Sequence, residues 1–108
     1  LSLDDIESDT SYEHCTFSVS NEPIHITDVI FDHCAFMQTN FNGADFSYVH
    51  WINSQFISAS WDQTKWFNCK ITNLQLAGSD FNEVHLENSK FLNCDLLEST
   101  FQAVKVKK

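Results

Sequence analysis

Four cysteines and five histidines are the residues of this chain that are best suited to bind a metal ion. Two of the cysteines directly follow a histidine, in the tripeptides Glu13–Cys15 (EHC) and Asp32–Cys34 (DHC). Thiolate, imidazole and carboxylate groups are the usual protein ligands of tetrahedral zinc, so these tripeptides are the first candidates for a metal site. Whether they can act together depends on the elements that carry them.

Those elements follow from an internal repeat with a period of five residues. Every fifth residue from Ile26 to Val106 is large and apolar, in an unbroken series of seventeen positions. A second series, two residues ahead of the first, holds mostly small side chains, and the remaining positions are mostly polar. Neither an α-helix, with a period of 3.6 residues, nor a flat strand, with a period of two, produces this pattern.

The period of five has a simple structural explanation. If the two apolar positions of each repeat point inward, the backbone must turn a corner every five residues, and four corners close a square coil. Successive coils of such a solenoid stack at the strand spacing of about 4.8 Å and stabilise one another as nearest neighbours. The sequence therefore predicts an all-β solenoid of about four to five coils. One outward column is expected to form a ladder of side-chain hydrogen bonds, namely His33, Asn53, Asn73 and Asn93.

The segments CAFMQTNFNGADFSYVH and AGSDFNEVHLENSKFLNCDLLESTF resemble the pentapeptide-repeat family, whose motif is roughly A-[D/N]-[L/F]-x-x. The resemblance covers residues 26–106 without a break in register. It implies a right-handed quadrilateral β-helix as the fold. Three Trp at the large position and Leu74 at the small position depart from the motif.

The repeat also divides the chain into three parts. Residues 1–11 are an N-terminal segment that could cover the open end of the solenoid, residues 12–106 form the β-helix, and residues 107–108 are a C-terminal tail. Because Phe17 and Ile26 are nine residues apart, one repeat plus four, we expect a loop at residues 18–25. Because the repeat does not decay before Lys108, we expect either further coils or two solenoids stacked end to end, and favour further coils.

The register argues against the metal site. All four cysteines fall at the small inward position, whereas His14 and His33 point outward, so the two residue types cannot share one zinc ion. Cys34 and Cys94 lie in one column but about 14 Å apart at strand spacing, beyond the reach of a disulfide. We therefore expect free thiols, which suit the reducing cytoplasm, and no cofactor.

The sequence gives no support for an enzyme or a membrane protein. It contains no phosphate-binding loop, nucleophile elbow or metalloprotease motif, and a solenoid filled with Phe and Trp leaves no interior cavity for a substrate. No apolar run is long enough to cross a bilayer. The formal net charge of −9, with six lysines and no arginine, disfavours direct contact with nucleic acid.

The outer surface offers two candidate binding sites. The first is a polar, partly acidic face, and we interpret four of its carboxylates as contacts for a basic protein partner: Asp45, Asp62, Asp80 and Glu83. A merely solvated acidic surface is the alternative. The second is an apolar column that could join two copies in a homodimer or be covered by the N-terminal segment: Met37, Ile57 and Leu97.

Two functions follow for a cytoplasmic, bacterial protein. One is a non-enzymatic protein-interaction or scaffold module. The other is implied only by the resemblance: members of the Qnr and MfpA type bind DNA gyrase or topoisomerase IV, both type II topoisomerases, as acidic DNA mimics and protect against quinolones. This chain shares their acidity and an interrupted coil, but it is about half as long and has no counterpart of their C-terminal dimerisation element.

Overall fold

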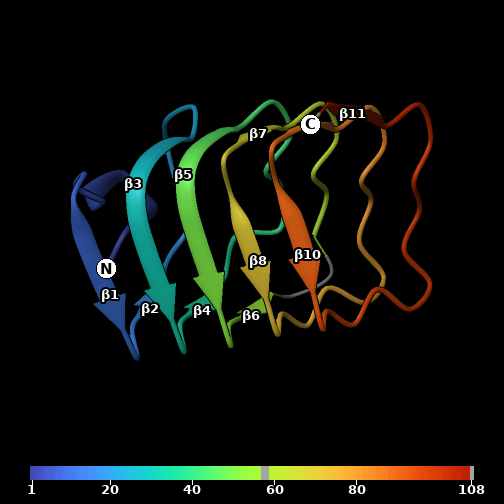
Figure 1. The fold of residues 1–108 in the computed structure, drawn as a ribbon. Helices are drawn as coiled ribbons and strands as arrows, with labels where there is room; N and C mark the ends of the chain where they lie inside the picture. Colours follow the sequence, from blue (N-terminus) through green and yellow to red (C-terminus); the bar gives the residue numbers. More distant parts are fainter. Residues whose placement is uncertain (57–58, 108) are drawn as a thin grey trace.

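The computed structural model describes residues 1–56 and 59–107, and it confirms the all-β solenoid (Figure 1). A short 3-10 turn, η1 (Leu3–Asp5), precedes the strands. The strands are β1 (Thr10–Glu13), β2 (Thr16–Phe17), β3 (His25–Asp32), β4 (Ala35–Phe36), β5 (Asp45–Ile52), β6 (Gln55–Phe56), β7 (Lys65–Phe67), β8 (Lys70–Thr72), β9 (His85–Glu87), β10 (Lys90–Leu92) and β11 (Lys105–Lys107). No helix among the described residues is long and apolar enough to cross a membrane.

Successive coils pair in parallel with a repeat of twenty residues. Phe31 pairs with Trp51, Trp51 with Ile71, and Ile71 with Phe91. Figure 1 shows these strands side by side along the solenoid, and the Cα extents of 32 × 27 × 25 Å make the molecule a short prism and not an elongated rod.

Four faces follow one another around each coil, and each is defined here by its large inward residues. Face A carries Phe31, Trp51, Ile71 and Phe91, and face B carries Phe36, Phe56, Leu76 and Leu96. Face C carries Phe41, Trp61, Phe81 and Phe101, and face D carries Ile26, Phe46, Trp66, Leu86 and Val106. Faces A and D contain most strands, whereas face C is held by single bridges at Asn40, Ser60, Asp80 and Thr100.

The corners between faces are made by residues in the left-handed conformation. This conformation recurs every five residues over much of the chain, for example at Asn68, Asn73, Gly78, Glu83 and Asn88. Asparagine and glycine adopt positive φ at little cost, but other residues such as His33, Tyr48 and Gln63 adopt it at corners as well. The corner amides also bond along the axis: Asn73 donates to Asn53 at 3.0 Å, as the predicted ladder requires for this pair.

The corner at Gly43 tests whether the left-handed backbone conformation limits which residue can stand there. Gly43 has φ +77°, and a Cβ atom added there would meet nothing within 4 Å, so only the backbone conformation opposes substitution. We expect Gly43→Ala to lower the free energy of unfolding by about 1 kcal/mol, measured by urea denaturation. Gly43→Asn is expected to lower it less, because asparagine tolerates the left-handed region. Equal losses for the two variants would contradict the assigned role of the corner.

The interior is filled by stacks of aromatic rings that run from coil to coil. On face C, Trp61 lies 4.2 Å from Phe41 between ring centroids, at an interplanar angle of 5°. Phe81 continues this stack at 6.0 Å from Trp61. The side chains of Trp51, Trp61 and Trp66 are fully or almost fully buried. The predicted aromatic interior is therefore confirmed.

The first coil has residues 19–24 outside strands and bridges, within the range 18–25 where the sequence predicts a loop. Tyr12 pairs with Phe31 and Phe17 with Phe36, each nineteen residues apart, so this coil is one residue shorter than the later coils. Phe17 is fully buried on face B, and the stretch up to Ile26 takes the place of face C without adding residues. Within this stretch only residues 19–24 lie outside strands and bridges, because Ser18 bridges to Ser2 and His25 begins β3.

The N-terminal segment lies against this first coil. Leu3 is buried, and its backbone N–H donates to the carbonyl of Ser18. The carboxylate of Asp4 accepts hydrogen bonds from the Ser20 hydroxyl and the Asn21 backbone, and these bonds lower the pKa of Asp4. Strand pairing begins at Thr10, two residues before the expected start of the β-helix.

Candidate protein-binding surface

Three of the four predicted acidic residues lie together on face C. Asp62 and Asp80 point outward from neighbouring coils, and Glu83 forms the corner between faces C and D with φ 55°. The Asp80 carboxylate accepts from the backbone N–H of Asn82 at 2.9 Å and from the Thr100 hydroxyl at 3.4 Å. The Oδ1 atom of Asp62 is buried, so a partner would reach this carboxylate from its Oδ2 side.

Asp45 does not belong to this group. It is the first residue of β5 on face D, where its Oδ2 atom lies 3.0 Å from Nδ1 of His25. Its partner in the next coil is Lys65. Asp45 therefore lies between His25 and Lys65, on face D just past the corner that Gly43 forms between faces C and D.

Two further carboxylates were missed by sequence reasoning. Asp95 points outward from face B, and Glu98 forms the next corner with φ 59°. We call faces B and C from residue 54 onward the acidic half: residues 54–63, 74–83 and 94–103. This half holds five acidic residues in the sequence and neither lysine nor arginine: Asp62, Asp80, Glu83, Asp95 and Glu98.

The lysines occupy the other two faces. We call faces D and A from residue 64 onward the basic half: residues 64–73, 84–93 and 104–107. It holds five lysines and a single acidic residue, Glu87. The five are Lys65, Lys70, Lys90, Lys105 and Lys107. If the sequence is aligned in rows of twenty residues, the length of one coil, the lysines separate from the acidic residues. The net charge alone does not show this separation.

The predicted apolar column is exposed where the structure describes it. The exposed fractions of Met37 and Leu97 are 55% and 69%, so the N-terminal segment does not cover them. Ile57, the third residue of the column, lies outside the described residues.

The cysteines and histidines occupy opposite sides of the wall, as the register predicts. Cys34 and Cys69 are buried, whereas the rings of His14 and His33 stack on the exterior with centroids 5.0 Å apart. Burial raises the pKa of the thiols of Cys34, Cys69 and Cys94 and so favours their unreactive protonated form. Among residues 1–56 and 59–107 no three metal-binding side chains come together.

Comparison with known proteins identifies the repeat. The family described as "Pentapeptide repeat region" matches residues 8–81, and "Pentapeptide repeats (8 copies)" matches residues 67–106. No curated protein matches the chain.

Solved structures that are similar to this chain include two that are described as follows. One is the pentapeptide repeat protein Rfr23 from the cyanobacterium Cyanothece 51142, with 11% identity over 86% of this chain and a TM-score of 0.37. The other is QnrB1, a plasmid-mediated fluoroquinolone resistance protein, with 12% identity over 94% of this chain and 86% of QnrB1, and a TM-score of 0.32. The match spans 60% of the length of Rfr23.

Proposed function

Because this chain belongs to the pentapeptide-repeat family, we propose that it is a non-enzymatic module that binds a basic protein partner through its acidic half. The observation that carries this proposal is the separation of charge, with five carboxylates and no basic side chain in the acidic half. Since aromatic rings fill the interior, contact with a partner takes place on the outer faces.

The acidic half suits a basic partner for electrostatic reasons. Adjacent coils lie about 4.8 Å apart, so lysines or arginines of one partner segment can reach carboxylates that project from successive coils at different positions around the solenoid. An exposed ion pair stabilises a complex by only about 0–1 kcal/mol, so the surface must act as a group. Its uniform sign also accelerates encounter with a basic surface and disfavours acidic partners.

Charge reversal tests this function. In isothermal calorimetry with a peptide rich in lysine and arginine, we expect Asp62→Lys/Asp80→Lys to weaken binding about tenfold, or ~1.4 kcal/mol. The control Glu7→Lys/Glu13→Lys makes the same change in net charge outside the acidic half and is expected to have little effect. Equal weakening by both variants would show that net charge alone attracts the peptide.

A type II topoisomerase is the second candidate partner. The observation in its favour is that face C presents Asp62, Asp80 and Glu83 from a polar surface without cations, as a protein that occupies a DNA-binding groove requires. A gyrase supercoiling assay with and without ciprofloxacin tests it. Inhibition or drug protection that Asp62→Lys/Asp80→Lys abolishes would support this partner, and no effect of the unmodified chain would count against it.

The exposed apolar column remains our candidate for contact between two copies in a homodimer. It lies on face B, beside the acidic residues, and its exposed side chains Met37 and Leu97 are available to a second molecule.

A further inference from the structure

We propose that the basic half is a second binding surface, which takes an acidic segment of a different protein with an aromatic or aliphatic side chain among its carboxylates. The proposal concerns faces D and A and does not depend on the partner of the acidic half. The solenoid would thus hold a basic partner on one half and an acidic partner on the other.

An exposed aromatic pair lies where faces D and A meet. Phe67 is the one residue among the Phe and Trp of the chain whose place in the repeat directs it outward, next to the inward Trp66. Its ring lies 5.7 Å from that of Tyr48, edge to face, and the two side chains are 39% and 54% exposed. Partly exposed aromatic residues ringed by charged ones are typical anchors of protein interfaces.

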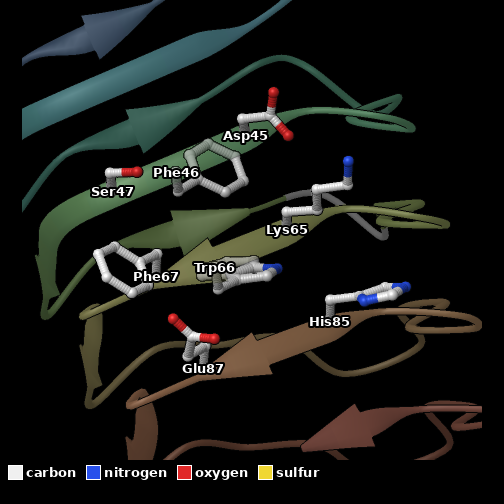
Figure 2. Close-up of a pocket in the computed structure, with 8 residues that line it drawn as sticks. All are labelled: Asp45, Phe46, Ser47, Lys65, Trp66, Phe67, His85 and Glu87. Atoms are coloured by element: carbon white, nitrogen blue, oxygen red, sulfur yellow. The ribbon is translucent and has the colours of Figure 1, made fainter. Parts of the chain in front are cut away.

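Two shallow hollows flank this pair. The first, on face D, has a volume of about 400 Å³, and its lining includes Phe67, Lys65, His85 and Glu87 as well as the carboxylate of Asp45. Figure 2 shows these side chains on successive strands of the face. The second, of about 440 Å³, contains Tyr48, Asn68, Lys70, Asn88 and Lys90. The first hollow thus joins Phe67 to one lysine, Lys65, and the second joins Tyr48 to two, Lys70 and Lys90.

Most of these lysines are free to bind carboxylates. Lys107 lies 3.6 Å from Glu87, but Lys65, Lys70, Lys90 and Lys105 make no ion pair within the described part of the chain. All five are exposed. Burial and the neighbouring Lys70 lower the pKa of His50 on face A, so His50 is neutral near pH 7 and the lysines supply the positive charge.

The chemistry of the surface favours an acidic protein segment over nucleic acid. Its cations are all lysines, and the whole chain carries a formal charge of −9, which repels a long phosphate backbone. A short acidic segment carries far less charge and can contact the lysines within a limited area. An apolar side chain in that segment would contact Phe67 and Tyr48, which phosphates cannot do.

The test uses a fluorescent, glutamate-rich peptide with one central phenylalanine, titrated with the whole chain in a polarisation assay at low and moderate salt. We expect Lys65→Gln/Lys70→Gln/Lys90→Gln to weaken binding at least tenfold and Phe67→Ala to weaken it about fivefold. The matched control Gln55→Glu/Gln75→Glu/Gln102→Glu lowers net charge equally on the acidic half and is expected to change binding less than twofold. Circular dichroism and Trp fluorescence verify that each variant is folded.

Three outcomes would overturn the proposal. Loss of binding in the glutamine-to-glutamate control as large as that in the lysine variant would show that net charge, and not this surface, governs the interaction. Unchanged binding by folded Phe67→Ala would remove the aromatic pair from the site. Tighter binding to single-stranded DNA or to phosphatidylserine vesicles than to the peptide would assign the lysines to a different class of ligand.

Discussion

Replacing Trp61 with alanine is expected to lower the free energy of unfolding by about 3–5 kcal/mol. The indole is fully buried and stacks between Phe41 and Phe81 of the coils on either side. Because a solenoid is stabilised by contacts between neighbouring coils, a cavity in the middle coil weakens both of its interfaces at once. Urea denaturation followed by circular dichroism measures the effect.

Phe67→Ala is the matched control for this prediction. Phe67 is also a large aromatic residue, but its side chain lies outside the solenoid and is 39% exposed. Its removal is expected to lower stability by about 1 kcal/mol or less, because less apolar area is lost from the folded state and no interior cavity is left. Similar losses for both variants would contradict the assignment of inward and outward positions.

Replacing Thr64 with valine is expected to lower the free energy of unfolding by about 1–3 kcal/mol. The Thr64 hydroxyl is fully buried, donates to the carbonyl of Trp61 at 2.8 Å and accepts from Nε1 of Trp66 at 2.7 Å. Valine preserves the shape of threonine but leaves the Trp66 indole N–H buried without a partner. The expected loss of stability therefore comes from the missing hydrogen bond and not from a change in side-chain volume.

Thr64→Ser keeps the hydroxyl and removes the methyl group. Comparing it with Thr64→Val therefore separates the effect of the hydrogen bond from the effect of side-chain volume. We expect this variant to lose less stability than Thr64→Val and to retain the tryptophan fluorescence of the native fold. Nε1 of Trp51 and of Trp61 is buried without a partner among the described residues, so Trp66 is the useful position for this comparison. Valine as stable as threonine would show that the bond to Trp66 contributes nothing.

The fold could be predicted because a single signal determines it. The unbroken series of large apolar residues from Ile26 onward fixes the period, the inward positions and the parallel register. Before Ile26 the series no longer determines the face of each residue, because Phe17 and Ile26 are nine residues apart and the period of five is interrupted. In the structure Phe17 lies on face B and Ile26 on face D, and the chain between them replaces a whole side of the coil.

The candidate surface could be predicted only in part, since surface residues must be placed around the coil as well as along it. Asp62 and Asp80 were grouped correctly on face C, because both flank inward residues of that face. The repeat predicts Asp45 at the edge of face C, but this residue directly precedes Phe46 and so projects from face D beside His25. The net charge of −9 counts the lysines without their positions, so it does not show that they lie on faces D and A.

The apolar pattern predicts where the corners lie but not their left-handed backbone conformation, because it reports only the direction of the side chains. Asparagine and glycine, as at Asn53, Asn73 and Gly78, are compatible with left-handed geometry, but Tyr48 and Glu83 adopt it as well. The surrounding coils impose this geometry on residues that do not favour it.

Amide chemical-shift mapping by nuclear magnetic resonance tests whether the acidic half binds a basic partner. The titrant is the lysine- and arginine-rich peptide used for calorimetry. We expect the largest shifts around Asp62, Asp80, Glu83 and Asp95, with the basic half unaffected. Shifts confined to the acidic N-terminal segment, or spread evenly over all four faces, would contradict it.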